Sequence, residues 1–255
     1  MKKTVLIAIA LITLLVVAKA ALAADYKLGL KLWTNTWEET IHPQAGGSQD
    51  FENGNALMAG PSLAVQFQDK WFANATYLTT PGKYKSSDWI VPGDTMTFKR
   101  DDLDLRIGRM FQPSYFFRPD PDINFGVYAG YKMIDAPASY TNTAAGFTEF
   151  RIGTWKQKGY GIGFLADIPL NQSTRVYGDL AFFNLKQEFT LSIAGRSQPF
   201  NASGVDFELG VVHTISESLS ANIGIKIEQS SGTEESGNVD INNFNGLIAA
   251  ITYAL

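Results

Sequence analysis

Apolar and polar residues alternate along most of the chain from Ala24 onward, with a period of two. Successive side chains of a β-strand point to opposite faces, so this pattern predicts strands with one apolar and one polar face. The alternation is clearest where Leu103, Leu105 and Ile107 are interleaved with charged residues and glycine. No stretch after Ala24 has a convincing helical period. The pattern therefore predicts an all-β protein.

Ten alternating segments follow one another, each about ten residues long, which is the length that a tilted strand needs to cross a bilayer. They lie at 26–33, 57–67, 71–80, 102–108, 124–133, 160–168, 175–188, 205–211, 221–228 and 246–255. Hydrophobic residues make up 45% of the chain and its mean hydropathy is −0.05. Those values exclude a helical membrane bundle but allow a barrel, in which only every second residue must be apolar.

The connections between the segments alternate in length. Connections after the first, third, fifth, seventh and ninth segments are long and polar, whereas only Asp69 and Lys70 separate the second segment from the third. One connection that this scheme makes short, 111–122, is long. Long loops at one end and short periplasmic turns at the other are typical of outer-membrane barrels. A soluble β-sandwich is the alternative, but it does not predict this two-ended arrangement.

The last segment, Gly246–Leu255, has an apolar face that ends with Tyr253 and Leu255. A tyrosine at this place suits a boundary between membrane and water. The segment resembles the closing strand of small Gram-negative outer-membrane β-barrels, although that family usually ends in phenylalanine. The resemblance implies a transmembrane antiparallel up-and-down barrel of about ten strands, located in the outer membrane and recognised by the barrel-assembly machinery through this strand. Eight strands, with a ragged region at 136–158 and one hairpin outside the wall, are the alternative.

Residues 1–23 have the features of a secretory signal peptide. A basic start with Lys2 and Lys3 precedes an apolar stretch, and Ala21-Leu22-Ala23 offers a small-x-small cleavage site. An N-terminal membrane anchor is the alternative. Residues 24–255 then form a single barrel domain. Cleavage removes three lysines and leaves 18 basic against 25 acidic residues, a net charge of about −7, which argues against a nucleic-acid partner. The chain has no cysteine, so disulfides and thiolate sites are excluded.

The polar face of the strands is expected to line the lumen, where it carries charges of both signs. The interior of a barrel of about ten strands is largely filled by side chains, so these charges need partners. One interpretation is a salt-bridged plug, and the other is a narrow hydrated path for a small polar solute, lined by Trp33, Trp37 and Tyr128. The predicted lumen residues are Lys27, Lys31, Arg100, Asp102, Asp104, Arg106, Lys132, Asp167, Asp179, Asp206, Glu208, Lys226 and Glu228.

Aromatic residues near the segment ends predict two interfacial girdles. The girdle at the short-turn end would contain Trp71, Phe111, Phe117 and Tyr253. The girdle at the long-loop end would contain Trp33, Trp37, Trp89 and Trp155.

No catalytic set, metal site or cofactor site is predicted. His42 in the first long loop and His213 near a short turn lack the companions of known outer-membrane hydrolases, and the glycines of 159–163 suit a crowded lumen better than a phosphate loop. The expected function is structural or that of a porin-like, narrow passive channel, with outer-membrane lipid and lipopolysaccharide as partners. A surface-binding protein or adhesin that acts through its long loops is the alternative. A hydrolase centred on His42 is a third hypothesis.

Overall fold

A computed structural model describes residues 24–67, 70–82, 84–87, 94–111, 123–142, 146–191 and 196–255. The predicted signal peptide lies outside the described residues. No helix in the described part of the chain is long and apolar enough to cross a membrane. The strands are β1 (Asp25–His42), β2 (Gln49–Gln66), β3 (Trp71–Thr79), β4 (Tyr84–Ser87), β5 (Asp94–Phe98), β6 (Asp101–Phe111), β7 (Asn124–Asn142), β8 (Phe147–Pro169), β9 (Thr174–Leu191), β10 (Arg196–Thr214), β11 (Leu219–Thr233) and β12 (Val239–Ala254).

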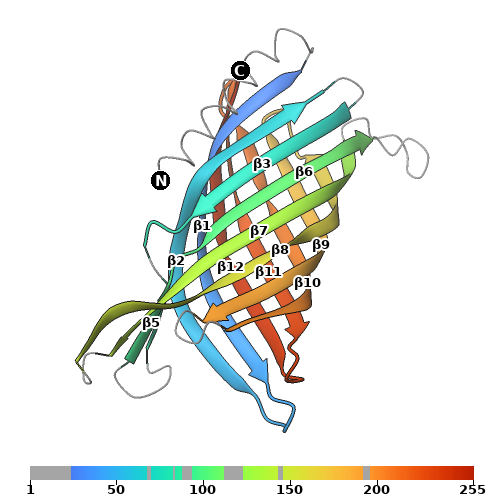
Figure 1. Ribbon diagram of the computed structural model, residues 1–255. Helices are drawn as coiled ribbons and strands as arrows, with labels where there is room; N and C mark the ends of the chain where they lie inside the picture. The colour runs from blue at the N-terminus through green and yellow to red at the C-terminus, as the bar shows by residue number, and fades with distance from the viewer. Residues whose placement is uncertain are drawn as a thin grey trace.

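Ten of these strands form a closed antiparallel barrel (Figure 1). Each pairs with its neighbours along the chain, β1 pairs with β12, and the pairing of β7 with β8 completes the ring. The ten barrel strands coincide with the ten alternating segments, so the up-and-down barrel of ten strands is confirmed over the alternative of eight. Closure of the ten strands leaves no open sheet edge across the apolar zone, which is what a β protein needs in lipid.

Most strands are longer than the predicted ten residues. β7 has 19 residues and β8 has 23, and the region 136–158 that was expected to be ragged is paired, with Ala136 opposite Trp155. The polar stretch 230–242 likewise belongs mostly to β11 and β12. The predicted long loops are therefore largely extensions of the strands beyond the apolar zone. The outer face of these extensions is mostly polar, as at Asp135, Ser139 and Lys156, so the alternation with an apolar outer face ends although the backbone ladder continues.

The segment 81–95, expected to be a loop, contains β4 and the start of β5. β5 pairs with β7 in line with β6, because Phe98 lies opposite Ala138 and Asp101 lies opposite Asp135. The N–H of Thr80 donates to the carbonyl of Arg100 at 2.9 Å, which bridges the interruption. β3 with β4, and β5 with β6, thus behave as two interrupted long strands. The β4–β5 hairpin continues the wall beyond β3 and β6 at the end of the barrel opposite the short turns. We call this the upper end; it lies at the bottom of Figure 1, where the hairpin flares away from the ring at the left.

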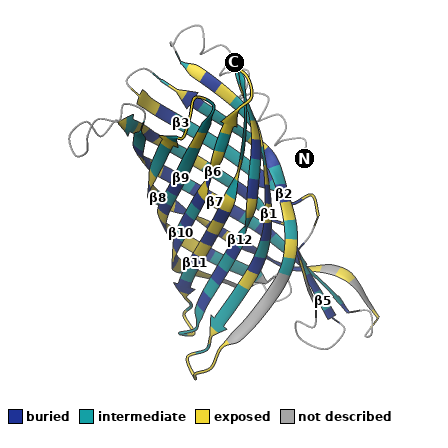
Figure 2. Cartoon of the chain, turned by 180° about the vertical axis from the view of Figure 1, so that it is seen from behind, coloured by how far each residue is buried: buried dark blue, intermediate teal, exposed yellow. Residues whose placement is uncertain are grey.

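Large apolar side chains cover the outside of the wall, and charged side chains are buried within it. Figure 2 shows the corresponding alternation of exposed and buried residues along the strands. Ile162, Ile223 and Ile251 are 61%, 62% and 57% exposed, whereas Arg100 is 1% exposed. An apolar surface this extensive is unsuited to water. The predicted assignment of faces, apolar outward and charged inward, is confirmed.

Candidate functional site: the barrel lumen

Eleven of the predicted charged residues face the lumen between the ends of the barrel. Because side chains alternate between faces, all of them except Arg100 have an apolar neighbour, one residue away, on the outer face. They come from six strands or their immediate ends: Lys31 from β1, Arg100, Asp102, Asp104 and Arg106 from β6 and the residue before it, Lys132 from β7, Asp179 from β9, Asp206 and Glu208 from β10, and Lys226 and Glu228 from β11.

Arg100 is the most buried of these charges. Its Nε and Nη2 donate to the two carboxylate oxygens of Asp102, each at 2.7 Å, and Nη2 also donates to Glu228 at 2.5 Å. The guanidinium carbon lies 3.9 Å from the ring centroid of Phe244 and 5.4 Å from that of Trp33. β6 and β11 are five strands apart in the ring of ten, so the Arg100–Glu228 pair crosses the whole lumen.

Lys132 forms a second set of ion pairs across the lumen. Its Nζ lies 2.6 Å from Asp206 and 2.5 Å from Glu228. Lys226 lies further away, at 3.9 Å and 3.8 Å from the same two carboxylates, and its Nζ is 4.8 Å from the Trp33 ring. Glu228 is therefore shared by three cations. Such sharing keeps each buried charge close to opposite charge, which offsets the cost of its removal from water.

Two smaller groups lie beside this crossing. Arg106 binds Asp104 with both Nε and Nη2 and also pairs with Asp179, whose other oxygen accepts a hydrogen bond from the Tyr128 hydroxyl at 2.6 Å. In the second group, Lys31 and the Tyr177 hydroxyl donate to Glu208 at 3.1 and 2.8 Å.

The remaining two predicted residues lie at the short-turn end. Asp167 accepts a hydrogen bond at 2.8 Å from Nε of Arg175, an exposed residue that the sequence analysis did not assign to the lumen. Lys27 lines the cavity at this end and does not join the central ion pairs. The structure thus brings eleven of the thirteen residues together. Whether they serve as a plug or as a solute path stays a prediction.

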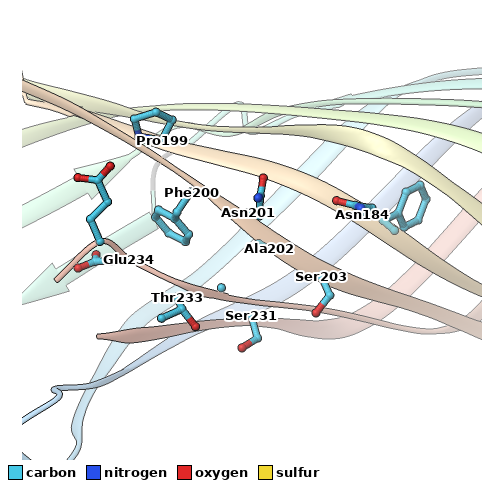
Figure 3. Close-up of a pocket in the computed structure, with 12 residues that line it drawn as sticks. Asn184, Pro199, Phe200, Asn201, Ala202, Ser203, Ser231, Thr233 and Glu234 are labelled. Carbon is cyan, nitrogen blue, oxygen red and sulfur yellow. The ribbon is translucent and has the colours of Figure 1, made fainter. Parts of the chain in front are cut away.

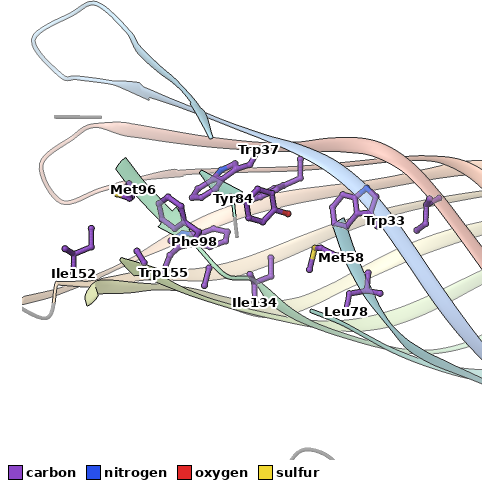
Figure 4. Close-up of a cluster of buried hydrophobic side chains, with 14 residues drawn as sticks. Trp33, Trp37, Met58, Leu78, Tyr84, Met96, Phe98, Ile134, Ile152 and Trp155 are labelled. Atoms are coloured by element: carbon purple, nitrogen blue, oxygen red, sulfur yellow. The ribbon is translucent and has the colours of Figure 1, made fainter. Parts of the chain in front are cut away.

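An aromatic plug fills the lumen above the charges, and we define it as Trp33, Trp37, Tyr84, Phe98, Trp155 and Phe244 (Figure 4). The ring of Trp37 is 4.3 Å from that of Phe98 and 5.5 Å from that of Phe244, between centroids. Trp33 is 0% exposed. The β4–β5 hairpin contributes Tyr84 and Phe98, which explains why this interruption in the wall folds against the lumen.

The plug corrects the predicted girdle at the long-loop end. Trp33, Trp37 and Trp155 point inward and are buried, so they do not contact lipid. They occupy the same alternation phase as the inward charges, and burying three large rings removes more apolar area from water than exposing them would. Trp89 and Phe117 lie outside the described residues.

The girdle at the short-turn end is confirmed for three residues. Trp71, Phe111 and Tyr253 are outward and 47%, 45% and 50% exposed. At the other boundary of the apolar belt the outward aromatic pair is Tyr131 and Tyr160, whose ring centroids are 5.0 Å apart.

A polar cavity of about 420 Å³ lies below the ion pairs, toward the short turns. Its wall includes Asn74, Thr76, Asn222 and Thr252 together with lower members of the charge network. Donors and acceptors from several strands make this half of the lumen suitable for water or a small polar molecule. Tyr128 covers part of it, and Gly163 leaves room for that ring, because a Cβ at Gly163 would lie 2.1 Å from Cζ of Tyr128. The glycines on this strand therefore serve packing in the lumen, as predicted.

A second cavity, of about 170 Å³, lies above the plug at the opposite mouth. Trp37, Phe98 and Trp155 line it together with the carboxylates of Glu39 and Asp240. Burial, and after it the neighbouring carboxylates of Asp240 and Glu234, raise the pKa of Glu39 to about 8. Burial likewise raises the pKa of Asp240 to about 6, against the hydrogen bonds that it accepts from Gln187 and Asn242.

At this mouth the structure also places hydrogen-bonded polar side chains around Asp240, and of these only Trp37 is predicted from the sequence to line the lumen. Trp37 Nε1 donates to Asn242 at 2.9 Å, and Gln157 donates to Gln187 at 3.1 Å. Asn242, Gln157 and Gln187 carry no charge; Asn242 and Gln157 lie in stretches expected to be loop or ragged, and Gln187 lies at the end of the segment 175–188. Their alternation phase, continued from the apolar segments below, was the available signal.

The two histidines lie at opposite ends of the barrel. His42 ends β1 at the upper mouth and is exposed, and His213 near the end of β10 has its Nδ1 3.1 Å from the Thr174 hydroxyl in an exposed turn. Among the described residues, no group of three or more His, Cys, Asp or Glu side chains is placed to hold a metal ion.

Neither a protein-family model nor a curated protein matches the sequence. Solved structures match by fold. The outer-membrane protease OmpT from Escherichia coli matches with a TM-score of 0.57 and 12% identity, over 91% of this chain and 97% of OmpT. The Pseudomonas putida toluene transporter TodX gives 0.35 and 11%, over 90% and 89%. The translocator domain of the autotransporter NalP from Neisseria meningitidis gives 0.39 and 13%, over 89% and 88%.

Of these three matches, the one to OmpT has a TM-score above 0.5 and supports the fold. At 12% identity it shows a shared architecture and says nothing about activity. The chain has the fold of Gram-negative outer-membrane β-barrels. A closed barrel with a continuous apolar outer belt is the form in which a β protein spans that membrane, so the chain is an integral outer-membrane protein.

Proposed function

We propose that this outer-membrane barrel has a closed lumen and a structural role, and that it does not act as an open passive channel. The observation that carries the proposal is the placement of Arg100, which is 1% exposed between two carboxylates and beneath the rings of Trp33 and Phe244. Water filling a continuous pore would reach such a side chain. Here the ion pairs connect opposite walls and the aromatic plug excludes solvent above them.

Single-channel recording in planar bilayers tests the closed lumen. The wild-type barrel is expected to give no conductance steps. The double variant Trp33→Ala, Phe244→Ala removes two rings of the aromatic plug and is expected to give steps, since the polar cavity below would then connect with the upper mouth. Ile223→Ala, on the outer face, is the matched control and should stay silent. Regular steps from the wild type at low voltage would contradict the proposal.

Binding of a partner at the surface is a second candidate function, favoured by the cavity at the upper mouth. Aromatic faces attract organic cations, and Glu39 and Asp240 add negative charge where the rings converge. A quaternary ammonium such as choline is therefore a suitable probe. Titration with choline should quench tryptophan fluorescence saturably in the wild type. Glu39→Gln combined with Asp240→Asn should abolish saturation, and an unsaturable wild-type response would exclude this candidate.

We propose no catalytic activity. The support for this is positional, because His42 and His213 lie at opposite ends and neither contacts the lumen charges among the described residues. His42→Ala is expected to leave any hydrolysis measured on peptide or lipid substrates unchanged. Loss of a wild-type activity in that variant would return the hydrolase hypothesis.

The barrel-assembly machinery is the proposed folding partner. β12 pairs with β1 from Lys27 to His42 in the closed ring, so before closure the edge of β12 offers a long row of unpaired backbone groups. Replacing Tyr253 and Leu255 with aspartate should lower the amount of folded barrel in outer membranes. Normal insertion of that variant would argue against recognition through this strand.

A further inference from the structure

On the outer face of the wall, Lys158 of β8 lies directly opposite Lys186 of β9. Both side chains are exposed and project to the same side. Among the residues that the structure describes, neither ammonium group has a carboxylate within ion-pairing distance. Like charges directly opposite each other on a sheet are destabilising. The next outward pair, Lys156 and Glu188, has opposite signs, so the two lysines stand out from their own ladder.

The lysines border a shallow cavity of about 470 Å³ on the outer surface. Tyr131 and Tyr160 form its lower side, and Tyr160 is 74% exposed. Asn184 and Asn201 complete its rim. The arrangement combines two cations with phenolic and amide groups that can donate hydrogen bonds, which together suit an anion with several oxygen atoms.

The height of this cavity on the barrel identifies what reaches it. Below Lys158, the outward residues of β8 from Tyr160 down to Ile168 are apolar or aromatic. Eight residue steps at about 3.3 Å, tilted by roughly 40°, give about 20 Å of apolar height, close to that of a transmembrane barrel belt. Lys158 and Lys186 therefore lie at the headgroup level of the leaflet on the long-strand side, away from the periplasmic turns. This is the outer leaflet.

A second concave surface, drawn in Figure 3, adjoins the first and includes residues nearer the extracellular end of β11. It extends over about 790 Å³ and shares Asn184 and Asn201 with the first. Ser203, Ser231 and Thr233 provide hydroxyl groups there, which match the donors and acceptors of a sugar. Glu234 and Glu235 stand at its far end, and their charge directs an anion back toward the lysines.

We propose that Lys158 and Lys186 bind a phosphate on the sugar headgroup of a phosphorylated glycolipid of the outer leaflet, such as lipopolysaccharide. The acyl chains lie along Ile162, Phe164 and Phe182, and the adjoining sugars lie over Asn201 and Ser203. The bound phosphate neutralises the repulsion between the two lysines. This site rests on the position in the outer membrane and is independent of whether the lumen is closed.

Native mass spectrometry of the detergent-folded barrel with bisphosphorylated lipid A tests the site. Retention by the wild type should need about tenfold less lipid A than retention by the variant Lys158→Gln, Lys186→Gln. Lipid A stripped of phosphate should bind the wild type no better than the intact lipid binds the variant. Arg109→Gln removes an exposed base at the periplasmic boundary and should match the wild type. Equal affinity of wild type and double variant would overturn the proposal.

Two further measurements separate the source of the anion from a merely structural role. Millimolar inorganic phosphate should not displace lipid A, and displacement would assign the site to a free anion instead. In glycolipid-free detergent, Lys186→Gln should melt at or above the wild-type temperature, because it removes repulsion. Added lipid A should reverse that order. A variant that melts below the wild type without lipid would mean that the lysine stabilises the fold itself, and the proposal would fail.

Discussion

The two halves of the lumen differ in what fills them, although the same long strands run through both and the β4–β5 hairpin is added in the upper half. The upper half is packed by the aromatic plug and is dry around Trp33 and Phe244, while the lower half holds a polar cavity of about 420 Å³. The ion pairs lie between them. The difference shows that sealing the lumen and cross-linking its walls fall to different residues: aromatic rings exclude water, and ion pairs connect opposite walls. A barrel sealed by charges alone would leave the sealing to groups that attract water.

The largest expected effect comes from removing the charge at the junction of the halves. Arg100→Ala leaves Asp102 and Glu228 facing the plug without their main partner, and it should lower the free energy of unfolding by about 3–5 kcal/mol. Urea unfolding in lipid vesicles measures this. Adding Asp102→Asn to the same variant should restore most of the loss, because Glu228 still pairs with Lys132 and Lys226. If stability is not restored, the loss in Arg100→Ala comes mainly from lost packing and not from the uncompensated charge.

A smaller loss is expected where the lower half is tightly packed. Gly163→Ala must displace the Tyr128 ring and its hydrogen bond to Asp179, so it should cost about 1–3 kcal/mol by the same unfolding measurement. Gly178→Ala is the matched control, because its new Cβ would come no closer than 3.8 Å to Leu209. Equal stability of the two variants would show that the lower half yields easily.

The upper mouth should respond to pH. Folding raises the pKa of Glu39 to about 8, above its ordinary value of 4.5, so the folded state binds more protons than the unfolded state between these values. Stability should therefore fall as pH rises from about 4.5 through about 8. Melting temperatures across this range test the sign. Glu39→Gln should reduce the decline of melting temperature with pH. An unchanged slope would mean that other groups cause the decline.

The smallest effect is expected at the periplasmic rim. Arg175 pairs with Asp167, but its side chain is 47% exposed, so Arg175→Ala should cost less than about 1 kcal/mol in urea unfolding. Comparison with Arg100→Ala measures how burial changes the contribution of an ion-paired arginine to the free energy of unfolding. A loss as large as that of Arg100→Ala would show that the lower half also depends on its ion pairs.

The wall could be predicted from the sequence because a bilayer imposes alternation on every strand that crosses it. Once polar residues occupy both faces, as beyond Thr34 on β1, alternation carries no further signal and the strand ends were placed too early. Strand ends in that region depend on backbone pairing, for which side chains give little indication.

The sequence predicts which charged residues face the lumen, but it does not predict which of them form ion pairs with one another. Alternation phase places Arg100 and Glu228 on the inner face, yet they are 128 residues apart and only the closed ring makes them partners. The inward placement of Trp33 and Trp37 was available from phase as well, because both share it with Lys31. Both residues are accordingly predicted from the sequence as lining of a solute path, and they are also assigned to the long-loop girdle from the general preference of tryptophan for interfaces; the structure supports the first placement. The aromatic contributions of β4 and β5 had no local signal, since they lie in an interrupted wall.

Between β5 and β6 the backbone of Arg100 does not belong to a regular strand ladder. Thr80 supplies the hydrogen-bond partners that a neighbouring strand would otherwise provide. The N–H of Arg100 donates to the Thr80 hydroxyl at 2.8 Å, and the N–H of Thr80 donates to the Arg100 carbonyl. One arginine thus fastens the β4–β5 hairpin to the wall through its main chain and spans the interior through its side chain. A pull on that hairpin from outside the cell therefore reaches the wall through the pairing of β5 with β7 and the centre of the barrel through Arg100.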